Sequence, residues 1–131
     1  MIEICVVGAH LSGMALNAEL VAQGAEFRRA VETAPLYRLH ALAGGPPRRP
    51  GLLRVGAEQG AAIATEVWAL PEDGFGRFVA GIPAPLCIGT LILADGSTPK
   101  GFLVEPAGLV GAQDITRVGG WRAFIAQLAT A

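Results

Sequence analysis

His10 lies in a turn that has a glycine at each end, Gly8 and Gly13, directly after the apolar run of residues 2–7. A turn that leads from a strand into a helix leaves backbone N–H groups without intrahelical partners, and these groups bind anions. A histidine titrates near neutral pH, so it can exchange a proton with such an anion. These residue types predict a small anion-binding site with an acid-base group at residues 8–11.

Two glycine-rich nucleotide motifs do not fit this turn. The dinucleotide motif Gly-x-Gly-x-x-Gly would need a glycine where His10 stands, because the pyrophosphate approaches the backbone there. The phosphate loop would need a lysine and a hydroxyl residue after Gly13, and the chain has Met14 and Ala15 instead. We therefore do not expect nucleotide binding at residues 8–15.

Composition limits the other classes of function. The chain has 131 residues, of which 52% are hydrophobic, and a formal net charge of -1, so we expect one domain over residues 1–131 and no binding of nucleic acid. Cys5 and Cys87 both stand in apolar runs, which is typical of buried cysteines rather than of metal ligands or a secreted disulfide framework. We expect no metal and no cofactor.

The chain also lacks the apolar segments that direct proteins to membranes. No basic and apolar leader precedes the first strand, and no apolar run approaches the ~20 residues that span a bilayer. These observations predict a cytoplasmic protein that does not bind membranes.

The pattern of apolar residues predicts three helices and six strands. We expect helices at residues 12–23, 71–82 and 120–128, and strands at residues 2–7, 27–32, 37–42, 60–70, 86–93 and 100–105. The proline-rich residues 44–51 are predicted to form a loop, and Asp95-Gly96 a turn between the last two strands. The order β-α-β-β-β-α-β-β-α predicts an α+β fold with a mixed sheet.

Several blocks of residues, taken in order, resemble the C-terminal domain of allophanate hydrolase from end to end. The blocks include GAHLSG at 8–13, YRL at 37–39, PGL at 50–52, VWALP at 67–71, IPAPL at 82–86, KGFL at 100–103, DIT at 114–116 and GGWR at 119–122. This resemblance implies a fold similar to the γ-glutamylcyclotransferases, with a mixed, barrel-like sheet, flanking helices and a pocket at the end of the first strand.

The resemblance also implies chemistry that differs from cyclotransfer. The cyclotransferases have an asparagine where this chain has His10, and by position Ile82 replaces their catalytic glutamate. An isoleucine cannot transfer a proton, which argues against cyclotransferase activity.

In allophanate hydrolases the amide bond is cleaved by a separate amidase domain with a Ser-Ser-Lys apparatus. This chain has one lysine, Lys100, and two serines, Ser12 and Ser97, so we do not expect it to be an amidase by itself. The resemblance implies that the domain takes the product of the amidase, N-carboxycarbamate, and promotes loss of carbon dioxide. Our hypothesis is therefore that the chain binds a small anionic carbamate and assists its decarboxylation.

This hypothesis assigns roles to particular residues. His10 is the candidate proton donor, and Glu105, at the end of a strand, is the candidate group that orients or recharges it. A cation is also needed, either Arg38 or one arginine of the pair at residues 48–49. The candidate substrate-binding residues are Gly8, Ala9, Leu11, Tyr37 and Arg38.

Two other functions remain open at this stage. The chain could be a non-catalytic module that dimerises or docks onto a separately encoded amidase subunit, and a homodimer fits either reading. Cyclotransferase-like activity on an amino-acid derivative is a third function, which Ile82 disfavours. The sequence also leaves open whether the chain is a whole gene product or part of a longer one.

Overall fold

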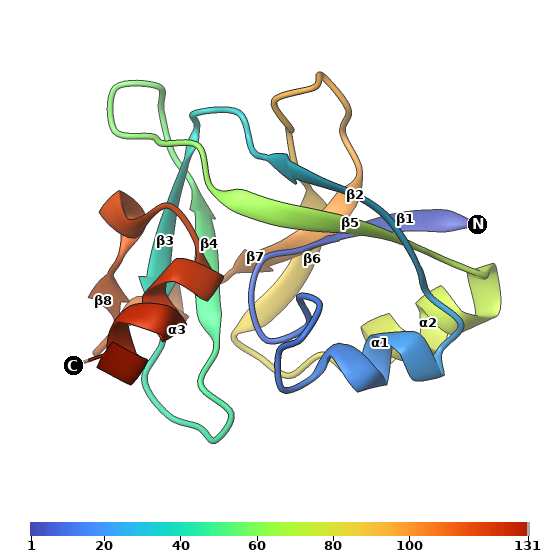
Figure 1. Ribbon diagram of the computed structural model, residues 1–131. Helices are drawn as coiled ribbons and strands as arrows, with labels where there is room; N and C mark the ends of the chain where they lie inside the picture. The colour runs from blue at the N-terminus through green and yellow to red at the C-terminus, as the bar shows by residue number, and fades with distance from the viewer. Residues whose placement is uncertain (131) are drawn as a thin grey trace.

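The computed structural model describes residues 1–130, which fold into two β-sheets flanked by helices (Figure 1). The larger sheet has the strand order β2-β5-β1-β7-β6. Its strands are β1 (Ile2–Val6), β2 (Glu26–Glu32), β5 (Ala64–Leu70), β6 (Leu86–Thr90) and β7 (Lys100–Val104). Strand β1 pairs antiparallel with β5 and parallel with β7, so the sheet is mixed, as the sequence predicts.

The smaller sheet and the helices complete the fold. The smaller sheet has the order β4-β3-β8 and consists of β3 (Tyr37–Ala41), β4 (Pro50–Arg54) and β8 (Gln113–Asp114). The α-helices are α1 (Asn17–Ala22), α2 (Glu72–Ala80) and α3 (Trp121–Thr130), and two 3-10 turns lie at Pro106–Leu109 and Thr116–Val118. Helices α1 and α2 lie beside the larger sheet and α3 beside the smaller one (Figure 1).

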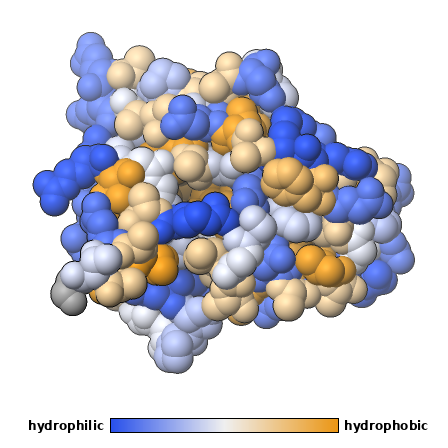
Figure 2. Space-filling model, viewed as in Figure 1, coloured by the Kyte–Doolittle hydropathy of each residue, from blue (hydrophilic) through white to orange (hydrophobic). Residues whose placement is uncertain are grey.

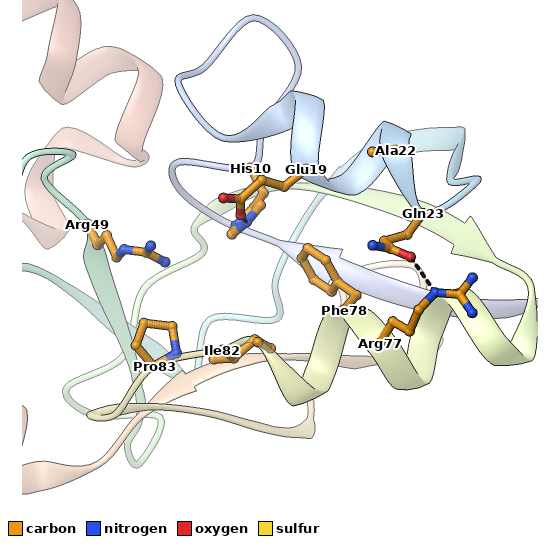
Figure 3. Close-up of a pocket in the computed structure, with 10 residues that line it drawn as sticks. His10, Glu19, Ala22, Gln23, Arg49, Arg77, Phe78, Ile82 and Pro83 are labelled. Carbon is orange, nitrogen blue, oxygen red and sulfur yellow. Dashed lines mark hydrogen bonds and ion pairs between the residues drawn. The ribbon is translucent and has the colours of Figure 1, made fainter.

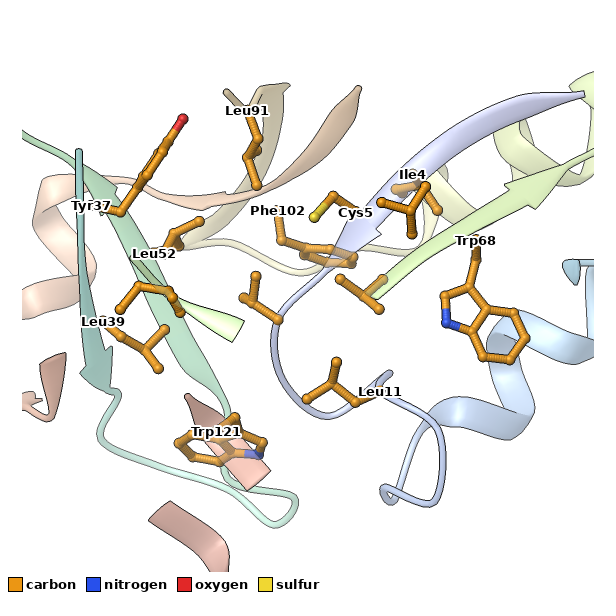
Figure 4. Close-up of a cluster of buried hydrophobic side chains, with 14 of the residues drawn as sticks. Ile4, Cys5, Leu11, Tyr37, Leu39, Leu52, Trp68, Leu91, Phe102 and Trp121 are labelled. Atoms are coloured by element: carbon orange, nitrogen blue, oxygen red, sulfur yellow. The ribbon is translucent and has the colours of Figure 1, made fainter. Parts of the chain in front are cut away.

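One continuous cluster of buried side chains joins the two sheets. Ile4 and Phe102 come from the larger sheet, Leu39 and Leu52 from the smaller one, and Trp121 from α3, and all five belong to the same cluster (Figure 4). Burying a side chain of this size contributes roughly 1.5–3 kcal/mol relative to leaving it exposed. The position of the first strand, which carries the turn at residues 8–13, is therefore fixed by both sheets.

The structure corrects three of the sequence predictions. The predicted helix at residues 12–23 begins only at Asn17, because Gly13 has a φ of +78°, which a right-handed helix cannot contain. The loop predicted at residues 44–51 ends at Arg49, since Pro50 opens β4; a proline is tolerated as the first residue of a strand. The strands also form two sheets within residues 1–130 rather than one barrel-like sheet.

The other predicted strands and helices are present with shifted ends, and the α+β class is confirmed. In residues 1–130, no helix has both the length and the apolar character needed to cross a membrane.

Candidate functional site

The turn after β1 is held in place at both ends. Leu11 N–H donates to the Gly8 carbonyl over 3.0 Å, and the Asn17 amide donates to the His10 carbonyl over 2.9 Å. A Cβ atom at Gly8 would stand 2.3 Å from the Pro50 ring, so only glycine lets the turn lie this close to β4. The turn therefore presents His10 from a fixed backbone.

Glu66 of β5 holds the middle of the turn. Its carboxylate accepts from Ser12 N–H at 2.8 Å, from the Ser12 hydroxyl at 2.7 Å and from Trp68 Nε1 at 3.1 Å, and it lies 3.4 Å from an Arg122 nitrogen. Burial acts to raise the pKa of Glu66, but these hydrogen bonds and the Arg122 charge outweigh it and lower the pKa. The buried group is therefore a carboxylate that fixes Ser12.

The His10 ring is enclosed by aromatic side chains. It is 6% exposed, stacks on Phe102 at 5.3 Å between ring centres, and meets the edge of Phe78 at 4.9 Å. Its Nε2 lies 3.2 Å from a Glu19 oxygen, which places the ring proton on Nε2. Burial lowers the pKa of His10 below 6.5, with Glu19 opposing that change and Arg49 adding to it. In the free protein His10 is therefore neutral at pH 7.

A cavity of about 400 Å³, which we call the His10 cavity, opens beside this ring (Figure 3). It is lined by His10, Glu19, Ala22, Gln23, Arg49, Arg77, Phe78, Gly81, Ile82 and Pro83. The lining comes from the turn, α1, the β3–β4 loop and the end of α2, so segments distant in sequence meet here.

The two arginines of the His10 cavity differ in their partners. Arg77 donates to the Gln23 amide oxygen over 2.8 Å and pairs with Asp73 over 3.3 Å. Arg49 is half-buried and has no ion pair with any residue of 1–130. Figure 3 shows its guanidinium directed toward His10, with Arg77 at the other end of the cavity. Arg49 is thus a cation available to a ligand beside His10.

The structure brings only some of the predicted site residues together. Gly8 and Ala9 line a small hollow next to the His10 cavity, which His10 and Arg49 also line. Leu11 is buried in the hydrophobic core. Gly8 and Ala9 therefore lie beside the His10 cavity, whereas Leu11 lines neither that cavity nor the hollow, and its N–H is already donated to the Gly8 carbonyl.

The other predicted residues lie elsewhere. Tyr37 is fully buried, and its hydroxyl accepts from Ile92 N–H over 2.9 Å, so it is part of the core. Arg38 donates to Asp114 over 2.8 Å and to the Gln59 carbonyl. Glu105 lines a separate cavity, together with Pro85 and Val110 among others.

Sequence reasoning missed Glu19, Arg77 and Phe78 as residues of the cavity. Glu19 follows His10 by nine residues, in the first turn of α1, and a longer predicted loop, with the helix beginning at residue 17 rather than 12, would have placed Glu19 at the helix start. No local signal connects Arg77 or Phe78 with His10. Ile82, which stands where the resemblance places the catalytic glutamate of the cyclotransferases, does line the cavity. The cavity wall is therefore apolar at this position.

Among residues 1–130, no three His, Cys, Asp or Glu side chains are grouped so that they could hold a metal ion. In the His10 cavity, the guanidinium of Arg49 could bind an anion and the imidazole of His10 could exchange a proton with it.

Known proteins resemble this chain over nearly all of its length. Urea amidolyase of Saccharomyces cerevisiae is 39% identical over 130 residues, which cover 97% of this chain but 7% of that protein. The crystal structure of Kluyveromyces lactis urea amidolyase superposes with a TM-score of 0.94 at 38% identity, covering 97% of this chain and 8% of that one. The chain thus spans less than a tenth of the length of these relatives.

A relative of similar length is also known. The crystal structure of a protein specific to uropathogenic E. coli has a TM-score of 0.88 at 34% identity, and the match covers 95% of both chains. The model of the family described as allophanate hydrolase C-terminal domain matches residues 2–126. This chain belongs to the family of allophanate hydrolase C-terminal domains.

Proposed function

We propose that the His10 cavity binds a small carboxylate or carbamate between Arg49 and His10, and that it assists the decarboxylation of N-carboxycarbamate in urea and allophanate degradation. The observation that carries this proposal is the half-buried guanidinium of Arg49, which has no ion pair within residues 1–130 and faces a buried, neutral histidine. Membership of the family supports the choice of substrate.

Arg49 suits a carboxylate because its charge is not neutralised by the protein. A guanidinium presents parallel N–H donors that match the two oxygens of a carboxylate. A charge-assisted hydrogen bond of this kind contributes about 1.5–3 kcal/mol. One carboxylate of the substrate would therefore be held at Arg49.

The reaction itself needs a proton at nitrogen. When the C–N bond to one carboxylate breaks, carbon dioxide leaves and the electron pair remains on nitrogen, which then takes a proton to give carbamate. His10 in its protonated form supplies that proton, and Glu19 stabilises the imidazolium that precedes the transfer.

Binding of the substrate would prepare His10 for this step. In the free protein, burial and the nearby Arg49 charge lower the pKa of His10. A dianion would compensate the Arg49 charge and add negative charge beside the ring, which raises the pKa of His10. We therefore expect uptake of a proton on binding, and tighter binding of dicarboxylates as the pH falls from 8 to 6.

The apolar side of the cavity favours the same reaction. The departing group is a charged carboxylate before the bond breaks and neutral carbon dioxide afterwards. Phe78 and Ile82 offer it no hydrogen bond, and an apolar environment disfavours the charged form relative to the neutral one. Ile82, which argues against cyclotransferase activity, thus suits decarboxylation.

The test couples this protein to an isolated amidase domain that forms N-carboxycarbamate from allophanate, and it follows release of carbon dioxide. Arg49→Gln and His10→Asn should each reduce the acceleration by roughly 10- to 100-fold, which corresponds to loss of about 1.4–2.8 kcal/mol. Arg48→Gln is the matched control, because Arg48 does not line the His10 cavity. Glu105→Gln tests the second catalytic residue expected from the sequence. A lower rate of carbon dioxide release in this variant would show that Glu105 takes part in the reaction.

A wild-type protein that gives no acceleration over the amidase alone would overturn the catalytic proposal. The second candidate, a docking module for an amidase, would then be favoured, because the relatives carry this region inside much longer chains. Co-elution of the protein with the amidase domain in gel filtration would distinguish the two functions.

A further inference from the structure

We propose that a second cavity, which is lined by residues of the 9–15 segment, the β3–β4 loop and α3, binds a small aromatic or branched monocarboxylate. This α3 cavity has a volume of about 350 Å³ and is separate from the His10 cavity. It is lined by Ala9, Gly13, Met14, Ala15, Pro47, Arg48, Trp121 and Ile125. The proposal goes beyond the decarboxylation function and does not depend on it.

The walls of the α3 cavity are almost entirely apolar. Met14 directly follows the turn at residues 8–13, Pro47 comes from the β3–β4 loop, and Trp121 and Ile125 come from α3. Trp121 is buried, and Figure 4 shows it on α3, on the side of the molecule that faces the turn. Figure 2, which views the molecule from the same side as Figure 1, shows hydrophobic residues (orange) among hydrophilic ones (blue). Cavities of roughly 300–1,000 Å³ with mainly apolar walls and few polar groups are typical of small-molecule sites.

Arg48 supplies the charge at the edge of this cavity. Its guanidinium carbon lies 5.4 Å from the centre of the Phe124 ring. A guanidinium over an aromatic ring is attracted to the face of the ring, and its N–H donors that point away from the ring can bind a carboxylate. Arg48 has no ion pair within residues 1–130, and no acidic side chain lines the cavity. The fitting ligand therefore has an apolar body and one carboxylate.

Residues that are adjacent in the sequence line different cavities. Arg48 lines the α3 cavity and Arg49 lines the His10 cavity, although they are adjacent in the β3–β4 loop. His10 lines the His10 cavity, and Ala9 before it lines the α3 cavity. A single substitution, at Arg48 or at Arg49, can therefore test ligand binding at one cavity without changing the lining of the other.

The experiment titrates phenylacetate into the ¹⁵N-labelled protein and follows backbone amide shifts by NMR. We expect saturable shifts centred on Ala15, Arg48 and Ile125, with a dissociation constant on the order of 1 mM. Arg48→Gln should weaken binding about tenfold, whereas Arg49→Gln should change it by less than about twofold. Phenylacetamide, which has the same shape without the charge, should bind about tenfold more weakly to wild type.

A second variant tests the cavity rather than the charge. Ala15 is exposed, so Ala15→Trp should fill the entrance without disturbing the core, and it should abolish the phenylacetate shifts. Phenylacetate that binds no better than phenylacetamide, or no saturable shift at millimolar phenylacetate, would overturn the proposal. So would loss of binding in Arg49→Gln alone, because the ligand would then lie in the His10 cavity. Decarboxylation assays of the same variants remain an independent measurement.

Discussion

At the scale of single residues, two buried ionisable groups are held in opposite states. Glu66 is 5% exposed and His10 is 6% exposed, so both lose most of their contact with water. Glu66 keeps its charge because Ser12, Trp68 and Arg122 donate to it. His10 has one side-chain partner, Glu19, and burial lowers its pKa. The donors around Glu66 thus outweigh the effect of its burial on the pKa, whereas at His10 the single partner Glu19 does not.

Glu66→Gln should destabilise the protein by about 1–3 kcal/mol at pH 7, because an amide cannot satisfy all the donors that the carboxylate binds. The pKa of Glu66 is lowered on folding. Its contribution to stability is therefore complete above the unfolded pKa, about 4.3, and is lost as the pH falls through the folded value. Urea unfolding at pH 7 and pH 3 should show the difference between wild type and variant shrinking at pH 3.

The control for this prediction is the exposed Glu58, where Glu58→Gln should change the free energy of unfolding by less than about 0.5 kcal/mol at both pH values. A difference between wild type and Glu66→Gln that stays constant from pH 7 to pH 3 would contradict a lowered pKa for Glu66.

At the scale of elements, the hairpin of β3 and β4 does most to position the cavities. Its loop carries Arg48 and Arg49, and Pro50 at the start of β4 lies against Gly8 of the turn. One residue further on, Gly51 lies against Val104 of the larger sheet, where a Cβ atom would stand 2.8 Å from the Val104 Cβ. Glycine at this position lets the two sheets approach each other.

Gly51→Ala should cost about 1–3 kcal/mol of stability, because an added methyl group would push the two sheets apart. It should also weaken carboxylate binding at Arg49 by displacing the loop. Gly56→Ala is the matched control, since a Cβ atom there meets no atom within 4 Å. Thermal unfolding of both variants measures the effect, and equal stability of the two would show that the close approach is not required.

At the scale of the whole molecule, the two sheets share one hydrophobic core. Each half contains one of the two tryptophans: Trp68 lies on β5 of the larger sheet, and Trp121 begins α3 beside the smaller sheet. Both tryptophans are buried in the same cluster. The halves should therefore unfold together, because neither can bury its apolar face without the other.

The Trp68→Phe variant keeps only Trp121, which reports on the half with the smaller sheet. The Trp121→Phe variant keeps only Trp68, which reports on the half with the larger sheet. For each variant, we expect the urea midpoint from tryptophan fluorescence to coincide with the midpoint from far-UV circular dichroism. Each variant is compared only with itself, so a change in stability caused by the substitution does not affect the result. Separate midpoints in either variant would show that the two halves unfold independently.

The sequence by itself determined the features that depend on residues close together in the chain. Strand β1 and the glycine-flanked turn that follows it were predicted from a local pattern, an apolar run that ends at a glycine, although the turn continues further than predicted and α1 begins only at Asn17. The order of blocks along the chain also sufficed to identify the family. The prediction of a loop from proline and glycine content was wrong at Pro50 and Gly51, which begin β4. Pro50 lies against Gly8 of the turn and Gly51 against Val104 of β7, and these contacts override the usual preference of proline and glycine for loops.

Only the tertiary structure decided which charges meet at the site. Arg49 is 39 residues from His10 in the numbering and reaches it because the β3–β4 hairpin packs on the end of β1. Arg38, which is equally basic, instead forms an ion pair with Asp114, and Tyr37 is buried in the core. Apolar periodicity encodes which face of an element is buried, whereas long-range packing of one element on another sets its neighbours. The sequence thus singled out His10 as the candidate acid-base group, and the packing of the two sheets placed Arg49 beside it.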